Sequence, residues 1–168
     1  EFPTKEHRPI ALFKEYMKGG YYPFFAQRDS HTRLQQIVNQ VLEVDIPKFA
    51  DLSFTTIEKL KRLMYVIAQS VPFKPNYSKL GRDLECHRTS VSDLVLLLEK
   101  SHMVQILRDD SFGVSSLGKV DKIYLGNTHL AYALSDSVPD VGNLRETVFL
   151  AAVSPKYDVM SSSVADFK

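Results

Sequence analysis

A run of short and basic side chains between residues 87 and 92 has the composition of a DNA-reading surface. Arg88, Thr89, Ser90 and Ser92 follow His87 at the start of a predicted helix. A recognition helix presents such N-terminal residues to base edges in the major groove, where an arginine can pair with guanine. Nearby cations could contact phosphates. The pattern predicts a nucleic-acid-binding set composed of Lys79, Arg82, Arg88, Thr89, Ser90, Ser92, Lys119 and Lys122.

A motif with the glycine and lysine spacing of a phosphate-binding loop lies shortly after that helix. It consists of Gly113, Gly118 and Lys119, but Val120 occupies the position where such a loop needs serine or threonine to hold magnesium. The loop must also follow a strand and open a helix, so that amide N–H groups face the phosphates. Because a strand is predicted after Lys119, we interpret the motif as the tip of a β-hairpin.

The histidines and the single cysteine do not have the spacing of a metal or catalytic site. Cys86 and His87 are adjacent and would diverge in regular structure, and no third residue is indicated that would hold the base against the sulfur. We therefore expect a structural cysteine, and neither a metal ion nor another cofactor in this chain. One cysteine excludes an internal disulfide, so the cytoplasm is the simplest compartment. The histidines are His7, His31, His87, His102 and His129.

Three predicted helices would position the DNA-reading residues. Thr55 or Thr56 can cap the first helix, and Asn76 can cap a short second one. The third helix begins after a turn in which Cys86 stands where glycine is common. Apolar residues at helical spacing predict the inner faces. These residues are Ile57, Leu60, Leu63, Met64, Ile67 and Val71, then Leu80 and Leu84, then Val91, Leu94, Val95 and Leu98.

Two strands are predicted after the third helix, over residues 103–107 and 122–125. Three helices followed by a hairpin is the order of a winged helix. We therefore predict a mainly α protein with a helical segment and a winged helix, that is, a helix-turn-helix with a β-hairpin wing. The expected division is a helical linker segment over 1–53, the winged-helix domain over 54–134 and a further segment over 135–168.

The flanking segments are predicted to be mostly helical. A helix from Pro9 should end at the glycine pair 19–20, and an aromatic loop over 21–25 should either fold onto the core or contact a neighbouring domain. A helix over 31–46 should be stopped or kinked by Pro47. Further helices are expected up to Leu134 and over 143–153, and the three serines at 161–163 should form an exposed link or turn.

Composition places the chain among ordinary globular proteins. Of its 168 residues, 44% are hydrophobic and 24% charged, and the formal net charge is +1. Residues 74–122 contain eight Lys or Arg against seven Asp or Glu, a small excess for a protein that binds nucleic acid by neutralising phosphates. The longest unbroken apolar run, 148–153, is too short to span a membrane. Because the sequence begins with Glu1 and not Met, we expect a piece of a longer protein.

Several stretches, taken in order, resemble a prokaryotic family of AAA-type P-loop ATPases. Members carry an ATPase domain, a winged-helix-like region and a C-terminal domain related to restriction-type nucleases. The resembling stretches are Leu12-Phe13-Lys14-Glu15-Tyr16, Gly20-Tyr21-Tyr22-Pro23-Phe24, Leu42-Glu43, Asp45-Ile46-Pro47, Lys59-Leu60-Lys61-Arg62-Leu63, Ser70-Val71-Pro72-Phe73-Lys74-Pro75-Asn76, Ser78-Lys79-Leu80, Lys122-Ile123-Tyr124-Leu125, Asn127-Thr128 and Gly142-Asn143-Leu144-Arg145-Glu146-Thr147.

The resemblance implies a parent protein that binds ATP and magnesium, with this chain following the ATPase core. By this resemblance, residues 135–168 would be the truncated start of the nuclease-like domain. Glu146 and Asp166 resemble acidic residues of that domain, whose Glu-x-Lys element would lie beyond Lys168, so metal-assisted cleavage by this chain is not expected. The chain would be non-catalytic and would dock double-stranded DNA or the parent's ATPase and C-terminal domains, relaying nucleotide state. A stand-alone winged-helix transcriptional regulator is the alternative. No membrane partner is expected.

Overall fold

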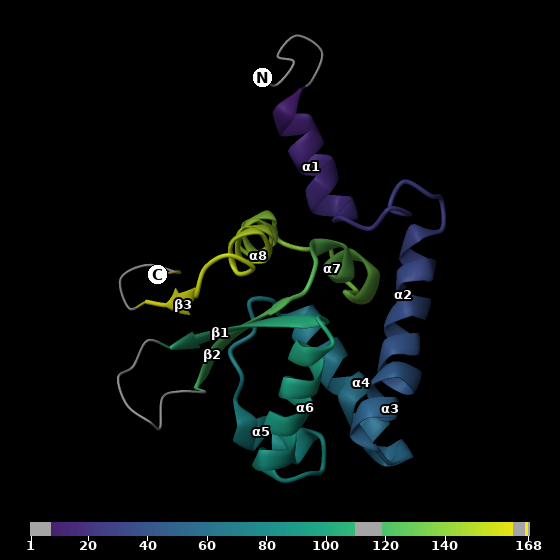
Figure 1. Ribbon diagram of the computed structural model, residues 1–168, viewed down its shortest axis with the longest axis vertical. Coiled ribbons are helices and arrows are strands. Elements are labelled where there is room, and N and C mark those ends of the chain that lie inside the picture. The colour runs from purple at the N-terminus through teal and green to yellow at the C-terminus, as the bar shows by residue number, and fades with distance from the viewer. Residues whose placement is uncertain (1–7, 110–118, 163–166, 168) are drawn as a thin grey trace.

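The chain is mainly helical, with one small sheet. The computed structural model describes residues 8–109, 119–162 and 167 (Figure 1). The sheet has the strand order β2-β1-β3. The elements are α1 (Pro9–Gly19), α2 (Ser30–Gln40), η1 (Val41–Asp45), α3 (Ile46–Ala50), α4 (Phe54–Gln69), α5 (Tyr77–Asp83), α6 (Arg88–Lys100), β1 (Val104–Asp109), β2 (Val120–Leu125), α7 (Thr128–Leu134), α8 (Val141–Val153) and β3 (Met160–Ser161).

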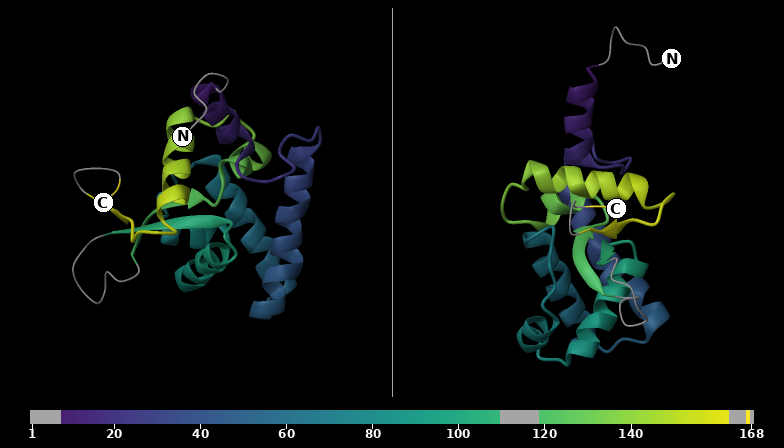
Figure 2. Two further views of the ribbon diagram at one scale, coloured as in Figure 1. Left: turned by 45° about the horizontal axis from the view of Figure 1, so that its top comes forward. Right: turned by 90° about the vertical axis from the view of Figure 1, so that its left-hand side faces the viewer.

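Helix α1 ends at the predicted glycine pair and projects away from the other helices (Figure 2). Gly20 has φ 61°, and a Cβ there would collide with the Asn127 carboxamide. Both observations require glycine, because the left-handed region and this close approach disfavour a side chain. The chain therefore turns sharply at Gly20 and lies directly against the start of α7.

The second predicted helix does not stop at Pro47. Helices α2, η1 and α3 follow one another without a break from Ser30 to Ala50, and Pro47 lies in the first turn of α3. Proline lacks an N–H and its ring crowds the carbonyl four residues earlier. The wider π turn of η1, in which Ile46 N–H donates to Val41 C=O, precedes the proline. Such a turn accommodates the residue that was expected to end or kink the helix.

The three central helices have the predicted order and most of the predicted inner faces, except that Ile57 is half-buried and Val71 is half-buried beyond the end of α4. Leu60, Leu63, Met64 and Ile67 of α4 are buried, as are the predicted inner residues of α5 and α6. The cap of α4 differs from the prediction, because Ser53 and not Thr55 or Thr56 accepts the Thr56 N–H. Asn76 caps α5 as predicted, with its Oδ1 3.0 Å from Lys79 N.

The two predicted strands form an antiparallel hairpin. Val104 pairs with Leu125, and the register shifts between Leu107 and Arg108. On the other edge of β2, Phe73 forms a single antiparallel bridge with Ile123. The segment between α4 and α5 therefore covers part of one sheet edge, and the hairpin is joined to the central helices by backbone hydrogen bonds as well as by side chains.

The C-terminal part covers the hairpin on its second edge and one face. Strand β3 pairs in parallel with β1, Met160 opposite Arg108 and Ser161 opposite Asp109. Ser161 is buried, so the expectation of an exposed link over 161–163 is wrong at this residue, because its backbone extends the sheet. Ser163 lies outside the described residues. The Tyr124 hydroxyl donates to Glu146 of α8 over 2.7 Å, which fixes α8 near the end of β2.

Buried apolar residues from all three expected segments share one core, which runs from Met17 through the central helices to Leu144. The boundaries after residues 53 and 134 stay predictions.

Across the described ranges, the structure contains no helix with both the length and the hydropathy that a bilayer crossing demands.

Candidate nucleic-acid interface

The start of α6 is fixed by a histidine cap and by a tight turn from α5. The Thr89 N–H donates to His87 Nδ1 at 3.4 Å, so the residue predicted as a polar contact also caps the helix. In the turn, Glu85 has φ 51° and Cys86 N–H donates to Gly81 C=O at 2.8 Å. A Cβ on Gly81 would lie 2.8 Å from the Cys86 carbonyl oxygen. The glycine that lets α5 approach the turn is therefore Gly81, within α5, and Cys86 is partly buried beside it.

Burial of one side of α6 determines which residues face outward. Val91, Leu94, Val95 and Leu98 are buried in the core. At 3.6 residues per turn, a helix with this inner face turns Thr89 to the opposite side and places Ser90 and Ser92 on its flanks, while Arg88 is exposed as the first residue of the helix. Accordingly, Arg88, Thr89 and Ser90 are exposed and Ser92 is half-buried.

A bidentate ion pair holds the hairpin against the C-terminal end of α6. The Arg108 guanidinium donates to both carboxylate oxygens of Glu99, at 2.8 Å and 2.7 Å. The hydrogen bonds to Glu99 raise the pKa of Arg108 above its ordinary value, and burial of the Tyr77 ring beside the pair raises the pKa of that phenol. Parallel N–H···O bonds of this kind restrict geometry in a way that a single ion pair does not. The end of β1 that pairs with the start of β2 is therefore fixed relative to α6.

Four of the eight predicted residues meet in one surface depression. Arg88, Thr89 and Ser92 of α6 and Lys119, just before β2, line a hollow of about 360 Å³. One cation and two hydroxyls at a helix N-terminus, with a second cation beside them, form an arrangement that can hold a phosphate group. Lys119 is also 3.6 Å from the Asp109 carboxylate, so an incoming anion would compete with this exposed ion pair. The remaining lining residues are Pro75, Tyr77 and Val120.

The other four predicted residues do not line this depression. Lys79 and Arg82 are exposed on α5, and Ser90 is exposed on α6. Lys122 is half-buried on β2, opposite Leu107. The eight residues therefore divide into a converging group and a surrounding one.

Sequence reasoning missed Tyr77, which contributes an aromatic ring to the depression. Its signal was its position directly after the cap Asn76, at the first residue of α5. An aromatic ring beside cations is the usual platform for a nucleobase.

The structure brings together two histidines that are far apart in sequence. The rings of His31 and His129 have centroids 5.1 Å apart, and His129 is 1% exposed. Burial, with a smaller contribution from His31, lowers the pKa of His129. Within residues 8–109, 119–162 and 167, no three His, Cys, Asp or Glu side chains are grouped closely enough to hold a metal ion.

Parts of two further predicted motifs fall outside the described residues. Gly113 and Gly118 of the phosphate-loop-like motif belong to residues 110–118, while Lys119 is described and is followed by β2, as predicted. Asp166, expected as an acidic residue of a nuclease-like core, is also outside. Glu146 is half-buried and accepts the Tyr124 hydroxyl, which gives this carboxylate a structural contact.

Comparison with known proteins gives a family without an assigned activity. The uncharacterized protein MJ1637 of Methanocaldococcus jannaschii is 22% identical over 112 residues, which cover 65% of this chain. The aligned region makes up only 22% of the length of that relative. No solved structure matches the chain. The family model described as "Domain of unknown function (DUF8612)" matches residues 10–140, and the chain therefore belongs to this family.

Proposed function

We propose that residues 54–134 form a winged-helix module that binds double-stranded DNA. In this proposal α5 and α6 are the helix-turn-helix, β1 and β2 are the wing, and α6 is the recognition helix. The supporting observation is the convergence of Arg88, Thr89 and Ser92 with Lys119 of the wing in one depression. A recognition helix and a wing that contact one duplex must present polar side chains toward a common surface.

The charge distribution favours weak, salt-sensitive binding. Arg88 and Lys119 contact the DNA in the depression, and Lys79 and Arg82 meet phosphates beside it. With four phosphate contacts at about 0.9 released ions each, the slope of log K against log salt would be about −3.6. Such a slope is shallow compared with that of strongly basic binders, in agreement with the small positive excess of this region.

A mobility-shift experiment at low salt tests the proposal. A 20-base-pair duplex of mixed sequence is titrated with the chain, with R88A and with K100A. Arg88→Ala should weaken binding about fivefold or more, because an arginine contact with DNA is lost. Lys100→Ala removes the same charge from the last turn of α6 and should have little effect. No shift of wild-type chain at low salt would refute DNA binding.

A neighbouring domain is the second candidate partner, because large apolar side chains are exposed away from α6. Ile10 is 73% exposed on α1 and Tyr21 is 57% exposed in the loop that follows. Exposed apolar groups of this kind mark protein contacts. In a longer protein, these residues would contact another domain while α6 contacts DNA, so that the module could pass a change of state between them.

We further propose that the parent is a cytoplasmic ATPase, with ATP and magnesium bound outside this non-catalytic chain. The support is the family resemblance of the quoted stretches together with the much greater length of the archaeal relative. The reading frame upstream of Glu1 tests this directly. A Gly-x-x-x-x-Gly-Lys-Ser/Thr sequence there would favour the ATPase parent, and a start codon immediately upstream would favour a stand-alone regulator.

A further inference from the structure

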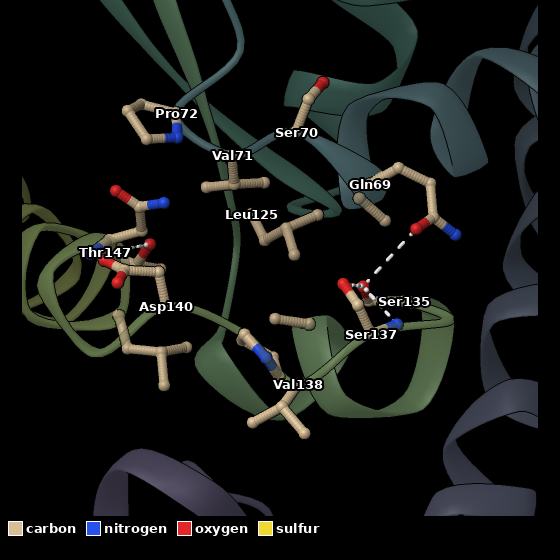
Figure 3. Close-up of a pocket in the computed structure, with 15 residues that line it drawn as sticks. Gln69, Ser70, Val71, Pro72, Leu125, Ser135, Ser137, Val138, Asp140 and Thr147 are labelled. Carbon is tan, nitrogen blue, oxygen red and sulfur yellow. Dashed lines mark hydrogen bonds between the residues drawn. The ribbon is translucent and has the colours of Figure 1, made fainter.

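A second cavity lies near the other end of β2, between the end of α4, the linker from α7 to α8 and the first turns of α8 (Figure 3). Its volume is about 450 Å³, within the range of small-molecule sites. Val71, Leu125 and Leu144 supply apolar surface. None of the DNA-facing residues lines this cavity, so it is a separate site.

Polar groups lie on two sides of this apolar surface. Figure 3 shows Asp140 and Thr147 on one side of Leu125, and Ser135 and Ser137 on the other. Asp140 caps α8, with its Oδ1 accepting Asn143 N–H at 3.1 Å. Among the described residues its Oδ2 has no hydrogen-bond partner. One carboxylate oxygen is therefore available at this side of the cavity.

Gln69 fixes the linker on the opposite side. Its Nε2 donates to Asp136 Oδ2 at 3.1 Å, and its Oε1 accepts Asp136 N–H at 3.3 Å. The Ser135 and Ser137 hydroxyls are 3.4 Å apart. These contacts hold a second carboxylate, that of Asp136, next to the two lining serines. The cavity thus has the Asp140 carboxylate and the Thr147 hydroxyl on one side, and on the other side two serine hydroxyls with the Asp136 carboxylate just behind the lining.

The charges around the cavity select positive ligands. Asp140 is its one charged lining residue in the part of the chain that the structure describes, and no Lys, Arg or His lines it. Carboxylates and hydroxyls accept hydrogen bonds, and an ammonium group donates three and accepts none. An anion would meet repulsion from Asp140. A ligand with an apolar middle and a donor at each end matches the two sides and the apolar surface between them.

We propose that this cavity binds a short aliphatic diammonium ion. One ammonium group contacts Asp140 and Thr147, the hydrocarbon chain covers Val71 and Leu125, and the second ammonium group contacts Ser135 and Ser137 beside Asp136. The shared chemistry is an alkylammonium, which a free diamine presents at two ends and a lysine side chain at one. The free diamine fits better because polar groups occupy both sides of the cavity.

Four compounds with the same four-carbon chain separate these possibilities. The full 168-residue chain is titrated in low salt with 1,4-diaminobutane, 1-aminobutane, 1,4-butanediol and succinate, and amide shifts are followed by NMR. The diamine should bind most tightly and shift the amides of Leu125, Ser137 and Thr147. Equal binding of 1-aminobutane would overturn the two-ended assignment. Equal binding of butanediol or succinate, or no shift with the diamine, would overturn the proposal.

Matched variants test where the charge acts. Asp140→Asn keeps a helix-capping side chain and removes the charge, and it should weaken diamine binding about threefold, as for a partly exposed ion pair. Asp136→Asn combined with it should weaken binding about tenfold. Asp83→Asn makes the same charge change on α5, outside the cavity, and should leave binding unchanged. Equal weakening by D83N and D140N would show general charge attraction and overturn the site.

Discussion

The two ends of β2 carry depressions of opposite character. At its start, Val120 lies beside Arg88 and Lys119 in a hollow of about 360 Å³. At its end, Leu125 lies beside Asp140 in a cavity of about 450 Å³ whose lining lacks cations throughout the described ranges. One six-residue strand thus separates a surface suited to phosphates from one suited to ammonium groups. A net charge of +1 conceals this separation, because the opposite charges are gathered in different places.

The largest expected effect comes from the helix that supports both depressions. Leu63 of α4 is fully buried, and Leu63→Ala should lower the free energy of unfolding by about 2–5 kcal/mol through lost burial and the cavity that remains. Urea denaturation measures this change. Leu96→Ala, at a residue that is 40% exposed, is the control and should cost much less. A loss below about 1 kcal/mol for L63A would contradict the described core.

Removing the ion pair between Glu99 and Arg108 should affect ligand binding at one depression and not at the other. Glu99→Gln loses a two-pronged contact between partly exposed groups, so we expect about 1 kcal/mol of destabilisation. Because the pair fixes the hairpin to α6, duplex binding should weaken while diamine binding stays unchanged.

The exposed pair of Lys48 with Asp45 provides the comparison for this experiment. Its partners are 61% and 45% exposed, so Lys48→Ala should change neither stability nor binding measurably. Equal effects of E99Q and K48A in a duplex titration would show that the fixed hairpin does not matter for binding.

Tyr124→Phe should have the opposite pattern and affect diamine binding more than duplex binding. It removes the hydroxyl that donates to Glu146 over 2.7 Å and links β2 to α8, and we expect a loss of about 1 kcal/mol in the free energy of unfolding. Because Asn143 and Thr147 of α8 line the cavity, the diamine titration should respond more than the duplex titration. A larger effect on duplex binding would reverse the assignment of α8 to the second depression.

Low pH should destabilise the region around α7 through protonation of His129. Burial lowers the pKa of His129 below its ordinary value of 6.5, so the unfolded chain takes up a proton at higher pH than the folded chain does. Above pH 6.5 the titration of His129 therefore does not change the free energy of unfolding. As the pH drops below 6.5 toward the lowered pKa of the folded state, the free energy of unfolding falls. Hydrogen exchange at pH 7.5 and pH 5.5 should show greater loss of protection in α7 than in α6. His129→Gln should reduce this difference, whereas His102→Asn, at an exposed residue, should preserve it.

The sequence pattern predicted the central elements well because their signals are local. Asn76 as a cap, the inner face of α6 and the β-branched residues of β2 are properties of a few neighbouring residues. The predictions failed where the deciding feature leaves no mark in the apolar spacing. Pro47 was expected to stop or kink its helix because its ring disfavours helical backbone, and the π turn that precedes it has no such mark. Ser161 looked like a link because serine is small and polar, whereas its pairing with Asp109 is a tertiary contact.

The candidate site was predictable only in part for the same reason. Arg88, Thr89 and Ser92 share one helix, so spacing was enough to place them together. Lys119 joins them because of hairpin register, and Tyr77 because of the angle between α5 and α6. The second cavity had no sequence signal, since its lining comes from α4, β2, α7, the linker and α8, and no local pattern links Val71 with Asp140.

The pairing of β3 with β1 has a consequence for how this chain can be shortened. The two strands are about 50 residues apart in sequence, so their pairing is a long-range contact that depends on the C-terminal segment. A version ending after α8 would leave the backbone groups of Arg108 and Asp109 without their partner strand. An unpaired strand edge can pair with the edge of another chain, so such a truncation should aggregate more readily. The two-residue strand β3 therefore protects this edge of the sheet from self-association.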